Sequence, residues 1–116
     1  MTVPAYALAY LREVDFGDDV IDYLQKIDAT LAPYDGRFLV HGGKLTPAEG
    51  TWDGDIVVIE FPDAEQARAW YESTAYQAIL ALRTENSTSI AAIVEGVPGG
   101  YQATDGLAAM LAQPMA

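Results

Sequence analysis

The chain has 116 residues, of which 51% are hydrophobic and 20% charged, so it is long enough and apolar enough to fold as one globular domain. Seventeen acidic residues against six lysines and arginines give a net charge of −11, which argues against nucleic acid or an anionic membrane surface as a partner. The absence of cysteine excludes disulfide bonds, zinc–thiolate sites and thiol catalysis.

The first part of the chain predicts a strand followed by a helix. Apolar side chains occupy both alternating sets of positions in residues 5–14, which is typical of a strand buried on both faces. We expect Asp18 or Asp19 to cap the helix that follows, and Pro33 and Gly36 to end it. Its apolar stripe is formed by Val20, Tyr23, Leu24, Ile27 and Leu31.

Two further strands are predicted in the middle of the chain. Residues 37–41 form the first of them, which stops at the glycine pair 42–43. A polar loop leads to residues 55–61, where four β-branched residues in a row indicate the clearest strand of the chain.

A second helix and a last strand complete the pattern. Asp63 and Gln66 resemble a capping box that opens the helix, and we expect a break at Ser73-Thr74 before it continues to Arg83. Residues 88–94 predict the last strand. The side chains expected to face the core from the first half of the helix are Ala67, Trp70 and Tyr71.

The order of these elements predicts an α+β, ferredoxin-like β-α-β-β-α-β fold, with a four-stranded antiparallel sheet and two helices on one face. Because the first, third and fourth strands are apolar on both sides, the face without helices would be exposed in a monomer. We therefore expect a homodimer in which two such faces pack together as a dimeric α/β barrel.

Residues 1–97 are expected to form this single domain, and residues 98–116 a C-terminal tail. In the tail, Leu107, Met110 and Leu111 have helical spacing, so it is either a short helix that docks on one of the subunits or a frayed end. The N-terminal segment has no basic run before its apolar residues, and no stretch approaches the ~18 apolar residues of a membrane span. We expect a cytoplasmic protein without a signal peptide.

His41 is the only histidine and the first candidate for chemistry. The two-residue period of a strand would place it on the same side as Arg37 and Leu39, where it could act as a general base. The alternatives are a partly buried strand residue bonded to backbone, an axial haem ligand, or a metal ligand together with carboxylates. We expect neither a metal nor another cofactor.

An aromatic group is predicted to meet between the helices and the sheet. Tyr23 lies on the first helix and Tyr71 and Tyr76 on the second, where Tyr6 or Tyr10 of the first strand would approach them. Such side chains can line a pocket for a flat or acidic small molecule, although their spacing also suits core packing.

Arg83 and Trp52 complete the set of candidate site residues. A guanidinium after an apolar turn could hold a carboxylate through two hydrogen bonds, or it could pair with Glu85 or Glu95. Trp52, in the loop before the third strand, could act as a lid over the pocket.

Several short motifs lie at intervals along the chain: GRFLVHGG (36–43), EGTW (49–52), IEFP (59–62), AWYES (69–73), Tyr76-Gln77, Leu82-Arg83 and Glu95-Gly96. Taken together, they resemble an uncharacterised family, domain of unknown function 1330, from about Tyr6 to Val97. The resemblance implies membership of the dimeric α/β-barrel superfamily, which includes cofactor-independent monooxygenases, lactone isomerases, polyketide cyclases and haem-degrading enzymes. Typical members resemble one another in having an arginine where this chain has His41, so an anion-binding role at that position would be weakened or replaced by proton transfer.

From these residues we expect a homodimer that binds a small aromatic or carboxylate-bearing metabolite, with cofactor-independent acid–base catalysis on that metabolite as a hypothesis. His41 would transfer a proton, while Arg83 and Tyr76 orient the ligand, with Tyr71, Tyr23 and Trp52 around it. The alternative is a non-catalytic dimeric accessory or interaction module, which would have a closed core without a cavity of ~300 Å³ or more.

Overall fold

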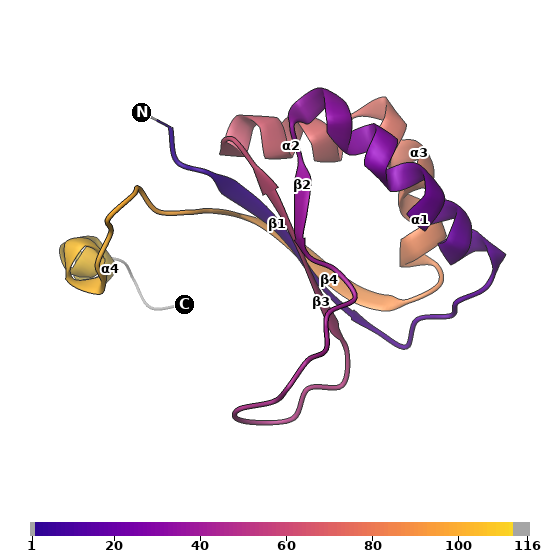
Figure 1. The fold of residues 1–116 in the computed structure, drawn as a ribbon, viewed down its shortest axis with the longest axis horizontal. Coiled ribbons are helices and arrows are strands. Elements are labelled where there is room, and N and C mark those ends of the chain that lie inside the picture. Colours follow the sequence, from indigo (N-terminus) through magenta and orange to yellow (C-terminus); the bar gives the residue numbers. More distant parts are fainter. Residues whose placement is uncertain (1, 113–116) are drawn as a thin grey trace.

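The structure is a computed structural model that describes residues 2–112. Four strands and three main helices form the body of the molecule. A 3-10 turn, η1 (Ala32–Tyr34), follows the first helix, and another, η2 (Ala103–Gly106), precedes a short C-terminal helix, α4 (Leu107–Ala112). The elements of the body in chain order are β1 (Ala5–Arg12), α1 (Asp18–Leu31), β2 (Arg37–Val40), β3 (Asp55–Phe61), α2 (Ala64–Glu72), α3 (Thr74–Thr84) and β4 (Thr88–Glu95) (Figure 1).

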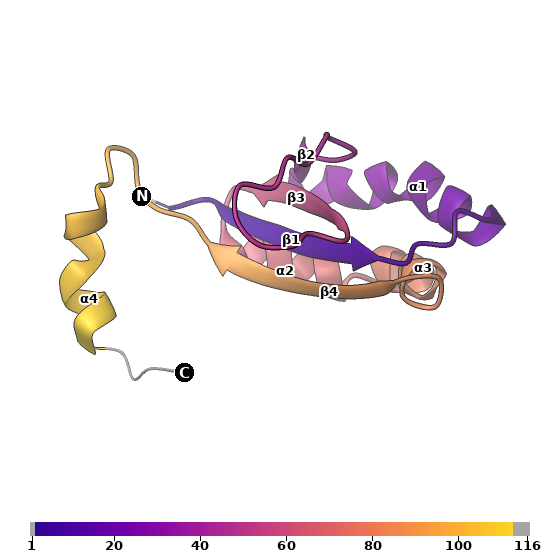
Figure 2. The same ribbon diagram turned by 90° about the horizontal axis from the view of Figure 1, so that it is seen from below.

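The strands form one antiparallel sheet in the order β2-β3-β1-β4, and α1, α2 and α3 all lie on one face of it (Figures 1 and 2). In the register, Ala7 of β1 lies between Ile59 of β3 and Ile93 of β4. Odd-numbered positions of these three strands therefore share the face that the helices cover. The predicted ferredoxin-like fold is confirmed.

The core lies between the sheet and the helices. Ala5 and Phe61 are completely buried there, next to Ile27 and Leu31 of α1 and Trp70 of α2. The even-numbered positions point away from the helices. We call this surface the helix-free face; its members are Tyr6, Leu8, Tyr10, Arg12, Ile56, Val58, Glu60, Thr88, Ile90, Ala92 and Val94.

The helix-free face is apolar and open to solvent. Ile90 is 73% exposed, and Leu8 and Val94 are also exposed. An apolar sheet face of this kind normally marks an interface, because leaving it in water forfeits the free energy of burial.

The ends of the helices agree with the sequence at one site and differ at another. Asp63 caps α2 as expected, accepting a 2.8 Å hydrogen bond from the Gln66 backbone N–H. The prediction that Asp18 or Asp19 caps α1 is wrong, because Gly17 is the N-cap and its carbonyl accepts from Ile21 N at 3.2 Å. The two aspartates lie in the first turn instead, where their negative charge is stabilised by the positive end of the helix dipole.

The expected break in the second helix lies at Ser73, which ends α2 and begins α3. Its extended backbone (φ −63°, ψ 147°) interrupts the helix. Its hydroxyl donates to the Trp70 carbonyl at 2.7 Å and accepts from the Tyr76 backbone N–H at 3.2 Å. One side chain therefore satisfies backbone groups of both helices.

Strand β2 departs from the simple alternation expected for residues 37–41. Its pairing with β3 shifts register between Phe38 and Val40, and the strand ends before His41. Arg37 consequently reaches Glu60 of the helix-free face, with its Nε 2.7 Å from the carboxylate, whereas His41 stacks on Phe38 at a ring-centroid distance of 4.7 Å. The expectation that Arg37 and His41 share a side is wrong, because a bulge inverts the period.

Two parts of the chain project from this body. Residues 41–54, here called the arm, leave the end of β2 and extend to the side of the sheet opposite the helices, and α4 lies apart beyond the end of β4 (Figure 1). The radius of gyration is 16.0 Å, whereas a compact chain of this length would have about 13 Å. None of the helices within residues 2–112 is both long and apolar enough to span a bilayer.

Candidate small-molecule site

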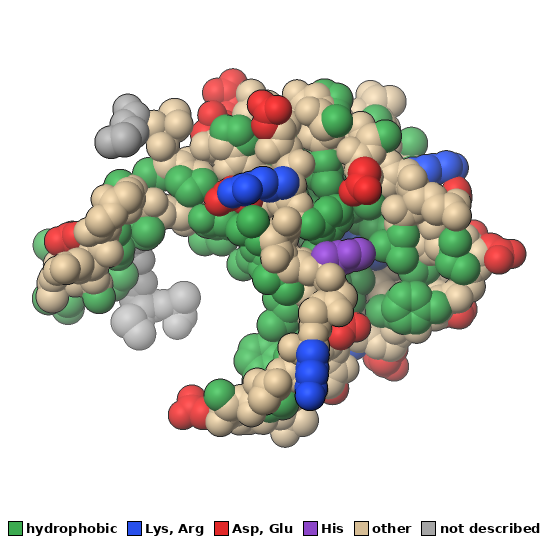
Figure 3. Space-filling model, in the orientation of Figure 1, with side chains coloured by type: hydrophobic (Ala, Val, Ile, Leu, Met, Phe, Trp, Pro, Cys, Tyr) green, Lys and Arg blue, Asp and Glu red, His purple; other side chains and the backbone are tan. Residues whose placement is uncertain are grey.

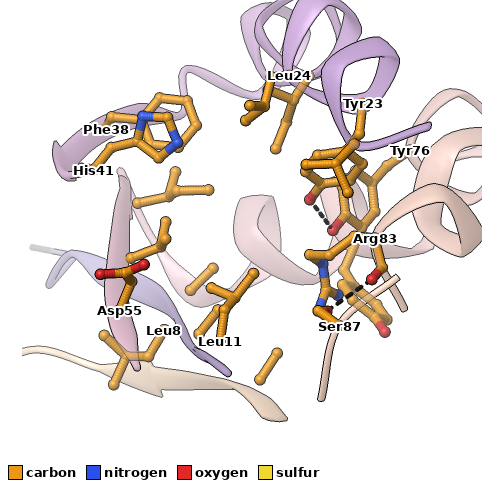
Figure 4. A pocket seen from close by; sticks show the side chains of 18 of the residues that line it. Leu8, Leu11, Tyr23, Leu24, Phe38, His41, Asp55, Tyr76, Arg83 and Ser87 are labelled. Atoms are coloured by element: carbon orange, nitrogen blue, oxygen red, sulfur yellow. Dashed lines mark hydrogen bonds between the residues drawn. The ribbon is translucent and has the colours of Figure 1, made fainter. Parts of the chain in front are cut away.

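A cavity of about 710 Å³ lies between the sheet and the helices (Figure 4). It is larger than the ~300 Å³ that separates ligand-sized pockets from a closed core. Figure 3 shows the histidine on the rim of a hollow with apolar side chains. Most of the wall is apolar, and includes Leu11, Leu24, Ile27, Val57 and Ile59.

Three polar side chains meet on one wall of this cavity: Tyr23 from α1 and Tyr76 and Arg83 from α3 (Figure 4). The Tyr23 and Tyr76 hydroxyls are 2.7 Å apart and share a hydrogen bond. Arg83 is only 8% exposed, and its Nη1 donates to Ser89 Oγ at 2.7 Å. Because one tyrosine hydroxyl accepts the shared bond, its own proton remains available to a ligand.

The turn between α3 and β4 holds Arg83 in place. Ser87 Oγ donates to the Arg83 carbonyl at 2.7 Å and lies within hydrogen-bond distance of Ser89 Oγ, at 3.2 Å. Sequence reasoning missed both serines as site residues. The available signal was two hydroxyls within six residues of an arginine in the last turn of a helix, where they can bond to free carbonyls and to the guanidinium.

The charge of Arg83 is not balanced by an acidic side chain. Ion pairs within residues 2–112 join Arg12 to Asp53, Lys26 to Asp22 and Arg37 to Glu60. Arg83 takes part in none of them, so the expected alternative pairing with Glu85 or Glu95 does not form in this structure.

Burial and neighbouring groups also set the protonation of this wall. Burial first, and then the adjacent Tyr76, raise the pKa of Tyr23 well above its usual value of 10. Burial alone lowers the pKa of Arg83, but the Tyr76 and Tyr23 hydroxyls more than offset it and raise the pKa overall. Arg83 is therefore a cation and Tyr23 a protonated phenol at neutral pH.

His41 lies at the mouth of the same cavity, exposed and stacked on Phe38. In Figure 4 it lies across the cavity from Arg83, so the two side chains border one shared space from opposite sides. Within the described part of the chain no three histidine, cysteine or acidic side chains gather as a metal site.

The other aromatic candidates divide between the core and the cavity. Trp70 is buried, donates from Nε1 to Thr30 Oγ1 at 2.9 Å and packs on Tyr76 at a centroid distance of 4.1 Å. Tyr71 is partly buried and borders the cavity. The expectation that Tyr6 or Tyr10 meets this group is wrong, because their even-numbered positions place them on the helix-free face.

Trp52 does not lie at the cavity. It belongs to the arm, where its ring meets Tyr10 edge-on at 6.0 Å and its Nε1 donates to the Glu49 carbonyl at 3.0 Å. Of the six candidate residues, the structure brings His41, Arg83, Tyr76, Tyr71 and Tyr23 together and leaves Trp52 on the other side of the sheet.

Comparison with family models supplies the identity of this domain. Residues 4–97 match the family described as domain of unknown function DUF1330. The chain belongs to this family. The match extends from just before β1 to just after β4 and includes the whole cavity wall. No curated protein matches the chain significantly.

Solved structures with the same fold are distant in sequence. A protein of unknown function from Rhodopseudomonas palustris, RPA0582, is 13% identical with a TM-score of 0.56, over 84% of this chain and 85% of that one. SnoaB, a cofactor-independent oxygenase from Streptomyces nogalater, is 11% identical with a TM-score of 0.58, over 87% and 100%. A dimeric ferredoxin-like protein of unknown function from Jannaschia sp. CCS1 is 15% identical with a TM-score of 0.56, over 80% and 99%. At such identities the likeness establishes the fold alone.

Proposed function

We propose that this DUF1330 domain is a homodimeric protein that binds a small hydrophobic monoanion, an aromatic or carboxylate-bearing metabolite, in the cavity between sheet and helices. The observation that carries the proposal is Arg83, a buried guanidinium on the wall of a largely apolar cavity without a carboxylate partner. Arg83 and Tyr76 bind the anionic group, and Tyr23 and Tyr71 border it.

The physical reason is the cost of an uncompensated buried charge. Removing a guanidinium from water is unfavourable unless hydrogen bonds and an opposite charge replace the solvent. Ser89 supplies one hydrogen-bond acceptor. A ligand carboxylate would supply the charge and accept two parallel N–H bonds, while its apolar body packs against Leu11, Val57 and Ile59.

Catalysis is the second part of the proposal. His41, at the mouth, is placed to exchange a proton with the end of the ligand that is remote from Arg83. SnoaB is named as a cofactor-independent oxygenase, which supports chemistry without a cofactor on this fold. We propose that this domain also catalyses a reaction without a cofactor, with His41 as the proton-transfer group.

The helix-free face is the proposed dimer interface. It is apolar and exposed, and its charged side chains are already paired: Arg37 with Glu60, and Arg12 with Asp53 of the arm. In a chain of net charge −11, this is a surface whose own charged groups do not add to the repulsion between two copies. The Jannaschia protein is dimeric and shares this fold, which supports a homodimer here.

Two fluorescent probes test the anion site directly. 8-Anilinonaphthalene-1-sulfonate is a hydrophobic monoanion, and N-phenyl-1-naphthylamine is the same molecule without the sulfonate. We expect Arg83→Met to weaken binding of the sulfonate probe about tenfold or more, as for a lost charge-assisted hydrogen bond, and to leave the neutral probe within about twofold.

Lys26→Met is the matched control, because it removes one positive charge from an exposed position on α1 outside the cavity. It should change neither affinity. If Arg83→Met and Lys26→Met affect the sulfonate probe equally, Arg83 is not the anion site and the proposal fails.

The role of His41 has its own test. As the chain contains a single histidine, its ring C2–H proton gives one assignable NMR signal. Addition of 2-naphthoate should shift this signal in the wild type, and the shift should be lost in Arg83→Met at the same ligand concentration. A signal that does not move at saturation would remove His41 from the site while leaving the anion site intact.

A further inference from the structure

The arm, residues 41–54, is fixed to the sheet by a reciprocal pair of hydrogen bonds. The Tyr10 hydroxyl donates to the Asp53 carboxylate, and the Asp53 backbone N–H donates back to the Tyr10 oxygen at 2.8 Å. Arg12 Nη1 lies 3.7 Å from the same carboxylate. The Tyr10 bond is the largest influence that lowers the pKa of Asp53, so the carboxylate is ionised at neutral pH and can accept this bond.

Further contacts give the arm a defined shape although it has no regular secondary structure. Trp52 bonds to the Glu49 carbonyl and packs edge-on against Tyr10. At the end of the arm, Gly54 lies so close to β1 that a Cβ there would collide with the Leu11 carbonyl oxygen. These contacts hold the tryptophan in place before any partner arrives.

No contact within the described residues gives the ordered conformation of the arm a role. Trp52 remains 47% exposed, does not border the main cavity, and lies beside a hollow of about 320 Å³ lined by Leu45, Ala48 and Ile56 among others. Ile56 belongs to the helix-free face, so the hollow and the apolar face are continuous. A large aromatic side chain that is held rigid and half exposed has the properties of an interface hot spot.

We propose that the arm packs against a second copy of this chain, with Trp52 buried on the partner when two helix-free faces meet. This inference rests on the homodimer proposed above and adds the residues that hold it. A two-fold axis would let each arm cover the edge of the other sheet, which buries both tryptophans in one symmetric interface.

A second copy fits this surface better than an unrelated partner. The face and the arm, together with Arg37 that pairs with Glu60, carry Arg12, Arg37 and Lys44 against Glu49, Asp53 and Glu60, so their charges balance. The surface is therefore complementary to itself, whereas a basic protein partner would be drawn to the acidic remainder of the chain.

Sedimentation equilibrium of the full chain tests the inference. We expect Trp52→Ala to raise the dimer dissociation constant about tenfold or more. Tyr10→Phe keeps the ring and removes the hydroxyl that holds Asp53, so it should raise the constant about threefold through lost preorganisation. Ile21→Ala is the matched control, because Ile21 is 45% exposed on α1, away from the helix-free face, and it should have no effect.

An Ile90→Asp variant separates this inference from the dimer itself. If Ile90→Asp gives monomers while Trp52→Ala and Tyr10→Phe dimerise as tightly as the wild type, the face is correct and the role of the arm is wrong. If the wild type is monomeric at about 100 μM, both fail. Circular dichroism and urea unfolding of Tyr10→Phe, the mildest change, verify that a weakened dimer is not an unfolded chain.

Discussion

The surroundings of the Tyr23 hydroxyl in the candidate site make the stability of the fold depend on pH. Burial and its neighbour Tyr76 raise its pKa above the value of 10 that an unfolded chain would have. Below pH 10 both states keep the proton and the native contribution is complete. As the pH rises above 10, the unfolded chain loses the proton while the native state retains it, so stability falls.

We therefore expect Tyr23→Phe to flatten the alkaline loss of stability. At pH 8 the variant should be less stable than the wild type by about 1 kcal/mol, the usual contribution of one hydrogen bond. Between pH 10 and 11 the wild type should lose about 1 kcal/mol more than the variant, a little less than the energy of one pH unit for a full proton because the unfolded tyrosine is already half ionised at pH 10. Urea unfolding at pH 8, 10 and 11 measures both values, and parallel curves would contradict the argument.

The candidate residues predicted from the sequence differ in how well their positions could be foreseen. Tyr23, Tyr76 and Arg83 lie on helices, where three- and four-residue spacing determines the buried side once the apolar stripe is known. Trp52 lies in a loop, whose direction depends on the Tyr10–Asp53 contact across 43 residues of sequence. No local pattern in the sequence encodes that contact. The sequence therefore suggested Trp52 as a lid over the cavity, whereas the structure places it in the arm.

At the scale of elements, Ser73 determines how α2 and α3 join and thereby where Tyr76 lies. We expect Ser73→Ala to lower the free energy of unfolding by about 1 kcal/mol, because it leaves the Tyr76 N–H and Trp70 carbonyl without their partner. Ser73→Thr keeps the hydroxyl and should cost less than half as much. Urea unfolding measures both variants, and equal losses would mean that the hydroxyl is not the cause.

Most elements were predictable because each carries its own period and end signals. The four strands, the capped second helix and its break at Ser73 all follow from local residues. The exception is the register of β2, which shifts between Phe38 and Val40 and so turns His41 toward the cavity. A bulge arises from how two strands pair, and residues 37–41 contain only one of the two strands, so their sequence does not predict it.

α4 is an element whose environment is incomplete in one chain. Leu107, Met110 and Leu111 are all exposed on it. A helix of six residues is too short to be stable in water on its own, so α4 needs a packing surface to persist. Docking on the partner subunit, one of the roles expected from the sequence, remains our proposal for α4.

At the scale of the whole molecule, the net charge of −11 opposes dimerisation, whereas the apolar proposed interface favours it. Bringing two copies together concentrates their acidic surfaces, although the charged groups of the helix-free face are already paired within each copy. The repulsion between the remaining charges extends over the Debye length, which is about 30 Å at 0.01 M salt and about 8 Å at 0.15 M.

The dimer should therefore tighten as salt is added. We expect the dissociation constant to fall about threefold or more between 10 and 150 mM sodium chloride, measured by sedimentation equilibrium at pH 7.5. Lys26→Glu replaces an exposed cation on α1 by an anion and takes the net charge from −11 to −13, so its dimer should be weaker at low salt and respond more steeply. A constant that rises with salt would instead indicate ion pairs between the two copies, and the charge-neutral interface argued from Arg37–Glu60 and Arg12–Asp53 would be wrong.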